Sequence, residues 1–334
     1  WHFQTVHHDI WNYDNPTAPS LLDVMIDGER VPILVQTTKQ SFAYVLNRET
    51  GEPIWPIEER PVPESMIPSE QTSPTQPFPT KPAAYEMQGI TEDDLIDFTP
   101  ELRQRAIEIM ADYQMGPLFN PPLHRDNDLG KRSAMLCPGG NGGTNIPGGT
   151  VVDPETGVLY TASIKSCGSP FLVPGAEADL QYENPTGTTL MAWASSGISA
   201  GPRGVQGLPI LKPPYSRITA IDMNTGDHLW FIPNGDTPDN VANNRALQGI
   251  DIPNTGNRTH ATALLTKTLL IYAEGRGGRS LLYANDKATG ERLGTVEIPA
   301  PTNTALMTYL HDGKQYIILP VGGRGYSGSL VAMA

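Results

Sequence analysis

"ITAIDMNTGDHLW" (residues 218–230) decides the fold of this 334-residue chain, because its pattern recurs three more times. The other copies are "AYVLNRETGEPIW" (43–55), "TVVDPETGVLYTA" (150–162) and "LLYANDKATGERLG" (281–294). Each copy has a short β-type run, an Asp or Asn, Thr-Gly two or three residues later, and a second β-type run. The Asp or Asn side chain caps a tight turn, and the glycine supplies the positive φ that the turn requires. Each copy therefore predicts a β-hairpin.

Two of the hairpins carry a tryptophan at the same place. Trp55 and Trp230 each follow the glycine of their Thr-Gly pair by four residues. A large aromatic residue at a fixed offset from a hairpin turn can dock one blade of a β-propeller against the next. One such turn is common in any protein, but four with matching flanks indicate a repeat architecture. The sequence therefore predicts an all-β chain built as a β-propeller.

The spacing of the hairpins indicates insertions. Successive Thr-Gly pairs lie between 64 and 106 residues apart, whereas a propeller blade takes about 40–50 residues. We expect the insertions between the blade cores, the largest covering residues 57–149. The chain then divides into a propeller region (1–56), a Pro-rich and helical insertion (57–149) and the remaining blades (150–334).

Within the insertion, the Pro-rich stretch "SEQTSPTQPFPTKP" (69–82) predicts an extended segment that does not donate regular ladder hydrogen bonds. Two short helices are expected after it. Thr91 and Asp94 form a capping pair for the first, and Thr99-Pro100 provides the cap and first position of the second. The apolar residues of the second helix recur at helical spacing and should face a core: Leu102, Ala106, Ile109, Met110 and Tyr113.

Composition limits the function classes. The formal net charge is −13 and no Lys/Arg cluster occurs, which argues against nucleic acid or an anionic membrane as partner. No apolar run approaches the 18 residues of a membrane span. The glycine-rich stretches "GGNGGTNIPGG" (139–149) and "EGRGGR" (274–279) are not followed by a helix pattern or by Lys-Ser/Thr. We therefore interpret them as places of close backbone approach and not as nucleotide sites.

The two cysteines, Cys137 and Cys167, leave two possibilities open. In a secreted or periplasmic protein they could form a disulfide, and in the cytosol they would be buried thiols. The stretch "VHHDIWNYD" (6–14) raises a second question, because so many polar groups are costly to bury without partners. It is either a solvated loop, with Asp9 and Asp14 capping turns, or a segment that surrounds something charged.

The sequence resembles the quinoprotein dehydrogenases that use pyrroloquinoline quinone (PQQ), the membrane glucose dehydrogenase and methanol dehydrogenase type. The residues that carry the resemblance are "WHFQTVHHDIWNYD" (1–14), "VPILVQTTKQSFAYVLNRETGEPIWPIEERPVP" (31–63), "SPTQPFP" (73–79), "GPLFNPP" (116–122) and "ALMTYLHDGKQYIILPVGGRGYSGSLVAMA" (305–334). The resemblance is stronger to the glucose dehydrogenase branch. It implies an eight-bladed propeller with PQQ on its axis, of which this chain corresponds to the C-terminal half, about four blades. The other half would come from the rest of a longer polypeptide or from another copy of the chain.

The resemblance also implies roles for residues of the opening segment. Asn12 stands where the family has an aspartate that binds the metal and acts as general base. An amide can offer its carbonyl oxygen to Ca²⁺ but cannot accept a proton near neutral pH. Asp14 matches a second acidic position and is the candidate metal ligand and displaced base, with Asp9 as the weaker alternative.

Three further residues match positions around the cofactor. Lys39, in "VQTTKQ", corresponds to the cation that contacts the quinone, where a fixed ammonium stabilises the negative charge of reduction. Arg324, in "GGRGYSG", takes the place of a histidine that some glucose dehydrogenases carry near the substrate. Ser163 lies where relatives have an asparagine that contacts the PQQ ring.

The resulting hypothesis is a PQQ-dependent dehydrogenase that oxidises an alcohol, polyol or aldose by metal-assisted hydride transfer to the quinone. We expect Ca²⁺ and not a lanthanide. Asn12 removes one negative charge from the site, and this lowers the binding affinity of a trivalent ion more than that of a divalent ion, because the Coulomb energy scales with the charge of the ion. Electrons would pass to a quinone or cytochrome acceptor, in the periplasm. The alternative, supported by Asn12, is a catalytically silent propeller that serves as scaffold or binding module.

Overall fold

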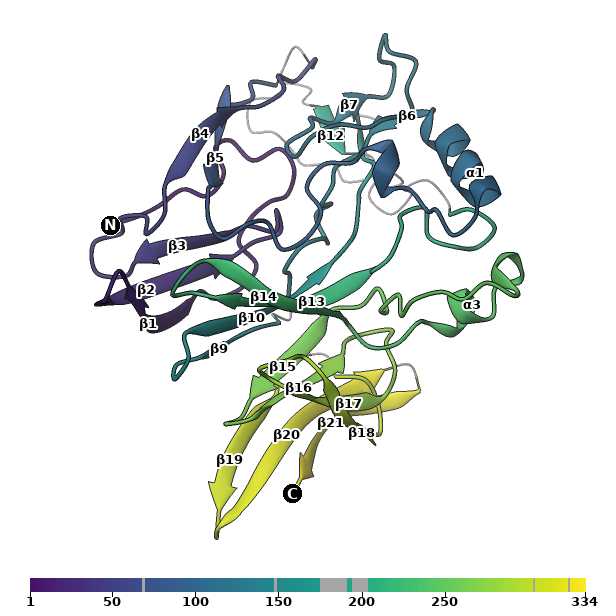
Figure 1. Cartoon of the computed structure of the whole chain (residues 1–334). Helices are drawn as coiled ribbons and strands as arrows, with labels where there is room; N and C mark the ends of the chain where they lie inside the picture. Colours follow the sequence, from purple (N-terminus) through teal and green to yellow (C-terminus); the bar gives the residue numbers. More distant parts are fainter. Residues whose placement is uncertain (68–69, 147–148, 175–190, 194–203, 303, 324) are drawn as a thin grey trace.

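Four antiparallel sheets succeed one another along the chain (Figure 1). The computed structural model describes residues 1–334 except 68–69, 147–148, 175–190, 194–203, 303 and 324. We name the sheets the first to fourth blade. Their strands are β1 (Ser20–Ile26), β2 (Glu29–Thr37) and β3 (Ala43–Asn47); β9 (Thr150–Asp153), β10 (Val158–Ile164), β13 (Ser216–Asp222) and β14 (Asp227–Pro233); β15 (Ala261–Leu265), β16 (Leu269–Glu274), β17 (Leu281–Asp286) and β18 (Arg292–Glu297); and β19 (Met307–His311), β20 (Lys314–Gly323) and β21 (Tyr326–Met333). The prediction of about four propeller blades is confirmed.

The Thr-Gly turns have the predicted capped geometry. The Asn47 side chain accepts the Glu49 and Thr50 N–H groups at 2.9 and 3.1 Å, and Asp286 accepts those of Ala288 and Thr289 at 2.8 and 2.9 Å. The four copies are not equivalent, however. Three of them follow the third strand of a blade, whereas the copy at 150–162 joins the first two strands of the second blade.

One predicted insertion is consequently misplaced. The chain leaves the second blade after β10 and returns to it at β13. Residues 165–215 are therefore inserted between two strands of one blade, and not between two successive blades. The reason is that the same capped turn can close any antiparallel pair of neighbouring strands. The turn sequence therefore predicts a hairpin but not its place in the blade.

Tryptophans do dock the blades, as predicted. Trp55 of the first blade lies on Gly226 of the second, where an added Cβ atom would come 3.2 Å from the indole ring. Trp230 of the second blade lies in the same way on Gly290 of the third, and its Nε1–H donates to the Ala288 carbonyl at 2.9 Å. Trp1 repeats the arrangement on Gly51, which the sequence pattern did not reveal.

Apolar side chains fill the spaces between neighbouring blades. The first and second blades share a core that includes Val24, Val45, Leu159 and Ile221. Equivalent clusters join the second blade to the third and the third to the fourth. Each sheet thus buries its faces against the next sheet, which is how a propeller forms one continuous core.

Residues 57–149 lie off the blades. Here β4 (Ile57–Pro61) pairs with β5 (Thr75–Pro79), so the Pro-rich stretch does join a ladder, contrary to expectation. Only every second residue of a strand donates to a given neighbour, and Pro77 and Pro79 alternate with residues that keep their N–H groups. The expected first helix is a 3₁₀ turn, η1 (Glu92–Asp94). The second is α1 (Pro100–Met110), with Thr99 Oγ1 accepting the Leu102 N–H at 3.2 Å.

Both excursions pack together beside the blades. Leu102, Ala106 and Met110 of α1 share a core with Leu211 and Tyr215 of the excursion from the second blade. A disulfide between Cys137 and Cys167 also joins the two excursions, which settles the two possibilities for these cysteines in favour of pairing. The remaining short elements are β6 (Tyr113–Gln114), β7 (Leu123–His124), β8 (Ser133–Ala134), β11 (Phe171–Pro174), β12 (Met191–Trp193), α3 (Asp239–Ala242) and η3 (Arg245–Leu247).

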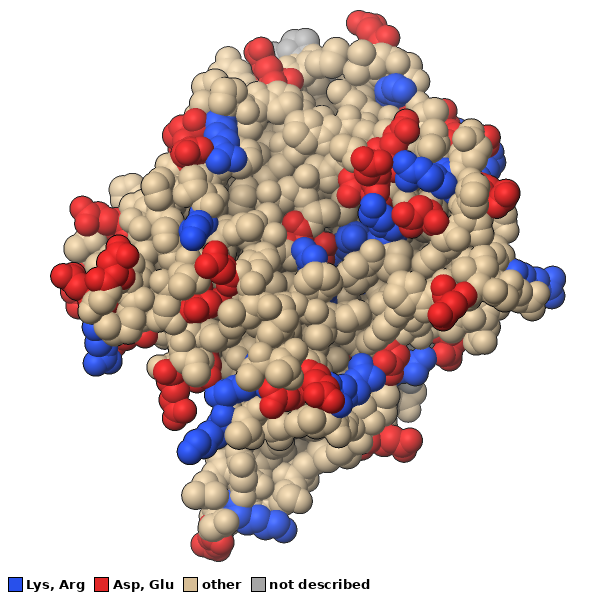
Figure 2. Space-filling model, in the orientation of Figure 1, with Lys and Arg blue, Asp and Glu red and all other residues tan. Residues whose placement is uncertain are grey.

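The surface is mixed in charge. Figure 2 shows acidic and basic side chains interspersed over the face that is drawn, without a continuous basic field. Among the described residues, no helix is both long and apolar enough to span a bilayer.

Candidate functional site

Asn12, Asp14 and Lys39 come together at one end of the first blade. The Lys39 ammonium donates to Asn12 Oδ1 at 3.1 Å and to Asp14 Oδ1 at 2.5 Å. Residues 12–14 lie in the segment that leads into β1, and Lys39 lies in the turn between β2 and β3. The Lys39 side chain is only 7% exposed, whereas that of Asp14 is 62% exposed. The site therefore combines a buried cation with an accessible carboxylate.

Flanking aromatic residues hold the opening segment in place. Trp11 and Tyr13 are buried around Phe119, while Asn12 and Asp14 alternate with them and are exposed. Trp11 Nε1–H donates to the Asn120 carbonyl at 2.9 Å, and the Tyr13 hydroxyl donates to the Pro138 carbonyl at 2.6 Å. Asn12 has a φ of +66°, a conformation that asparagine tolerates better than most residues. Anchoring the two rings thus turns the polar side chains toward Lys39.

Asp9 has a different task. Its carboxylate accepts the Trp11 N–H at 2.9 Å and the Tyr13 N–H at 2.6 Å. Asp9 therefore caps a turn, which is the role that the solvated-loop alternative gave it. Desolvation raises the pKa of Asp9, and the nearby Asp14 charge adds to this, against the lowering effect of the two N–H donors. Asp9 supports the shape of the segment and makes no hydrogen bond to Lys39 in the described structure.

The glycine-rich loop at 139–144 closes over this group. A Cβ atom on Gly140 would come 2.9 Å from Asn12 Nδ2, and one on Gly143 would overlap the Lys39 carbonyl. The Thr144 N–H donates to the Thr38 carbonyl at 3.2 Å. The interpretation of this stretch as a place of close backbone approach is therefore confirmed.

The structure places Ser163 in a neighbouring, buried polar cluster. Its hydroxyl donates to Glu86 Oε2 at 3.2 Å, and Arg217 Nε lies 3.4 Å from the same oxygen. Tyr85 connects this cluster with the Lys39 turn, because its hydroxyl donates to the Thr38 carbonyl at 2.9 Å while its own carbonyl accepts from Arg217 at 2.7 Å. Ser163 and Lys39 thus belong to adjacent but separate groups, and Arg324 lies outside the described residues.

Sequence reasoning missed Glu86 and Arg217. Glu86 is buried, with its side chain 1% exposed, and Arg217 lies in β13 opposite Ser163. Neither residue belongs to a motif, and they lie 131 positions apart in the sequence. No sequence signal could have paired them.

The described residues contain no cluster of three or more His, Cys, Asp or Glu side chains suited to a metal ion. The two predicted metal ligands, Asn12 and Asp14, both turn an oxygen to the Lys39 ammonium. Calcium takes six to eight oxygen ligands, so these two could supply only part of its coordination. A buried ammonium, in contrast, suits an electron-accepting quinone, because it stabilises the negative charge formed on reduction.

Comparison with known proteins identifies the family of the chain. Residues 1–317 match the family described as PQQ, "Glucose/ethanol/alcohol dehydrogenase, beta-propeller domain". The chain is 28% identical to quinoprotein glucose dehydrogenase of Escherichia coli (strain K12), covering 98% of this chain and 41% of that protein. It is 31% identical to the glycerol dehydrogenase large subunit of Gluconobacter thailandicus, covering 98% of this chain and 45% of that protein. The chain thus spans less than half the length of these relatives.

The fold agrees as well. The crystal structure of quinohemoprotein alcohol dehydrogenase from Comamonas testosteroni superimposes with a TM-score of 0.54 over 99% of this chain and 40% of that one, at 17% sequence identity. With the sheets, the docking tryptophans and the family match in agreement, the chain belongs to the PQQ β-propeller domain family of glucose, ethanol and alcohol dehydrogenases.

Proposed function

We propose that this chain is part of a PQQ-dependent dehydrogenase that oxidises an alcohol, polyol or aldose. The observation that carries the proposal is the buried Lys39 ammonium held between Asn12 and Asp14. Its support is the family membership of the chain and the sugar and alcohol dehydrogenases among its relatives.

The cofactor would supply the hydride acceptor when bound. Lys39 would bind the quinone oxygens of the cofactor and stabilise the negative charge that develops on them. This effect is large where water is excluded. Asp14 is exposed and ionisable, so it can take the proton of a substrate hydroxyl group. Asn12 can orient Lys39 and offer an oxygen to a cation, but it cannot act as a base.

Calcium is the proposed metal, with Asn12 and Asp14 each giving one oxygen and the other ligands coming from elsewhere in the full-length protein. We further propose a quinone or cytochrome as electron acceptor and a periplasmic location. A disulfide-containing chain is consistent with an oxidising compartment.

A catalytically silent scaffold or binding module is the second candidate. Asn12 favours it, because this residue removes the family's base from its usual position. The two candidates differ in what the full-length protein does with PQQ, Ca²⁺ and an electron-accepting dye.

The test is dye reduction by the reconstituted full-length protein with a panel of alcohols, polyols and aldoses. We expect turnover in the wild type and a loss of about 100-fold or more in Lys39→Ala and Asp14→Ala. Lys267→Ala, at an exposed turn between β15 and β16, is the control. Absence of turnover and of bound PQQ under every metal tested would contradict the enzyme and favour the scaffold.

A further inference from the structure

Tyr85 holds the turn that carries Lys39. We call residues 38–42, which join β2 to β3, the Lys39 turn. The Tyr85 hydroxyl donates to the Thr38 carbonyl at 2.9 Å and accepts the Thr38 N–H at 3.0 Å, so both backbone groups of the residue before Lys39 bind the same side chain. Tyr85 is completely buried. Its hydroxyl group therefore fixes the backbone from which the Lys39 side chain starts.

The far side of the turn has the same kind of support. The Tyr85 N–H donates to the Ser41 carbonyl at 3.2 Å, and Gln88 Nε2 donates to the Gln40 carbonyl at 2.8 Å. We call residues 85–88 the clamp. Because the clamp bonds the backbone both before and after the lysine, the turn has little freedom to move the ammonium group.

The Lys39 turn is costly to keep in this conformation. Ser41 has a φ of +70°, which residues other than glycine rarely adopt. The Ser41 hydroxyl and the Gln40 side-chain amide are buried and make no hydrogen bond within the described chain, which is unfavourable. A strained conformation persists only where the surrounding contacts outweigh its cost. The clamp supplies such contacts, so weakening it should let the turn relax and displace Lys39.

The clamp is itself anchored in the second blade. Arg217 Nε, in β13, donates to the Tyr85 carbonyl at 2.7 Å and lies 3.4 Å from Glu86 Oε2. The Ser163 hydroxyl, in β10, donates to the same oxygen at 3.2 Å. The Glu86 side chain is only 1% exposed, and a buried carboxylate needs such partners. The position of Lys39, in the first blade, therefore depends on polar groups of the second blade.

We propose that Tyr85, Glu86 and Gln88 are positioning residues, which act through Lys39 by holding its ammonium group in place for the bound cofactor. The proposal rests on the proposed function, in which Lys39 stabilises the negative charge of reduction. Such electrostatic stabilisation is effective when the charged group is fixed beforehand, because no reorganisation is then required. Loss of the Tyr85 hydroxyl should therefore weaken cofactor binding although this group is buried behind the turn.

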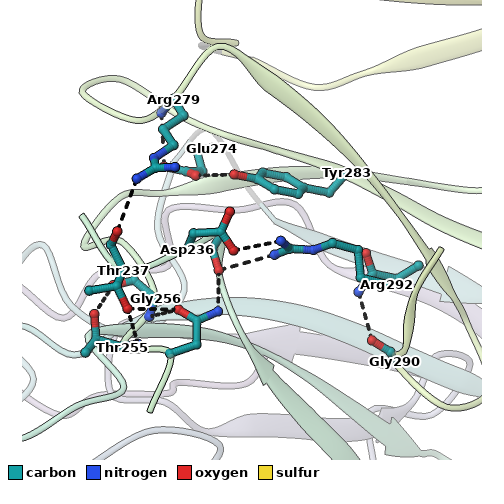
Figure 3. A network of polar contacts seen from close by, with 12 residues as sticks. Asp236, Thr237, Thr255, Gly256, Glu274, Arg279, Tyr283, Gly290 and Arg292 are labelled. Carbon is teal, nitrogen blue, oxygen red and sulfur yellow. Dashed lines mark hydrogen bonds and ion pairs between the residues drawn. The ribbon is translucent and has the colours of Figure 1, made fainter. Parts of the chain in front are cut away.

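A second buried tyrosine provides the control. Tyr283, in the third blade, is also fully buried, and its hydroxyl donates to Glu274 Oε1 at 2.6 Å (Figure 3). Glu274 also accepts from Asn257 Nδ2 at 2.5 Å, so it keeps a donor in Tyr283→Phe. Within the described chain, this network makes no hydrogen bond to the Lys39 turn. Tyr283→Phe thus removes a buried hydroxyl group, as Tyr85→Phe does, but from a different network.

The experiment compares the full-length wild type with Tyr85→Phe, Gln88→Ala and Tyr283→Phe. The first measurement needs no cofactor: it follows reductive methylation of Lys39 in PQQ-free protein by mass spectrometry, with the exposed Lys267 as internal standard. The Lys39 side chain is only 7% exposed and is hydrogen-bonded, so the wild type should react slowly. The second measurement is PQQ affinity by calorimetry, with and without Lys39→Ala. Gln88 is only partly buried, so its variant keeps the test valid if Tyr85→Phe does not fold.

We expect Tyr85→Phe to raise the Lys39 methylation rate about tenfold and to weaken PQQ binding by a similar factor. Gln88→Ala should change both by about threefold, because it removes one hydrogen bond to the turn and not two. Tyr283→Phe should change neither. In the Lys39→Ala background, Tyr85→Phe should weaken PQQ binding no further, because the two residues act as a unit.

An unchanged Lys39 methylation rate in Tyr85→Phe and Gln88→Ala would overturn the proposal. An equal rise in Tyr283→Phe would also overturn it, because the rise would then report general loosening of the fold. A loss of PQQ affinity that is the same with and without Lys39 would show that Tyr85 does not act through the lysine. Wild-type protein that binds no PQQ would refute the proposed function instead, while faster methylation confined to the clamp variants would still support the clamp.

Discussion

Gly290→Ala should destabilise the contact between the second and third blades. Gly290 has a φ of +77°, where alanine costs about 1–2 kcal/mol more than glycine. The added methyl carbon would also lie 3.0 Å from Ile232 Cγ2 and 3.0 and 3.1 Å from two atoms of the Trp230 ring. Overpacking of this kind costs about 1–3 kcal/mol. The free energy of unfolding should therefore fall by about 2–5 kcal/mol.

Gly313→Ala separates the two terms. Gly313, in the turn between β19 and β20, has a φ of +75° but no heavy atom within 4 Å of the added carbon. This variant should lose only the conformational part, about 1–2 kcal/mol. Gly226→Ala, with Trp55 at 3.2 Å, should lie between the two.

Urea unfolding of the full-length variants, followed by tryptophan fluorescence, measures the order. The expected order of stability is wild type, Gly313→Ala, Gly226→Ala, Gly290→Ala. If Gly290→Ala were no less stable than Gly313→Ala, the tryptophan would not be docking the blades, and the reasoning would be refuted.

Three further predictions concern the disulfide, a buried ion pair and the metal. Replacing Cys137 and Cys167 together by Ala should cost about 3–4 kcal/mol of unfolding free energy, because the bond closes a separation of 30 residues; the wild type under reductant should match the variant in urea unfolding. Lys287→Met should cost about 3–5 kcal/mol at pH 7, because it leaves the buried Asp153 carboxylate, 2.6 Å from Lys287 Nζ, unpaired. Titration of metal-free full-length protein should show activation by Ca²⁺ at lower concentration than La³⁺, and Asn12→Asp should raise turnover and improve La³⁺ binding more than Ca²⁺ binding.

The Lys287→Met effect should depend on pH. Desolvation acts to raise the pKa of Asp153, but hydrogen bonds from Lys287, Thr156 and the Glu155 N–H outweigh it and hold the pKa below its ordinary value. The carboxylate therefore contributes stability above the unfolded-state pKa of about 3.9 and loses it as the pH falls through the lower folded-state value. The difference between wild type and variant should shrink below about pH 4. A constant difference from pH 7 to pH 3 would contradict this assignment.

The sequence alone determined the elements that depend on neighbouring residues. The capped Thr-Gly turns and the Thr99 cap of α1 form from hydrogen bonds that span two or three residues. Their repetition, with Trp55 and Trp230 at one offset, was enough to predict a propeller. The same reasoning misassigned the copy at 150–162, because a turn carries no information about which strands of a blade it joins.

The site depended on contacts between distant segments. Asn12 and Asp14 meet Lys39 across 25 to 27 positions, and Ser163 meets Glu86 across 77. The resemblance to a known family singled out Asn12, Asp14 and Lys39. Their hydrogen bonds arise only when Trp11 and Tyr13 pack around Phe119 and bring the opening segment to the turn between β2 and β3.

The tertiary structure alone decided the pairing of Cys137 with Cys167 and the cluster of Glu86 with Arg217. Each of these depends on where two excursions return to the blades. Local sequence specifies turns and caps, because their hydrogen bonds join residues two or three positions apart. Burial and charge pairing depend instead on which distant segments of the chain pack against one another.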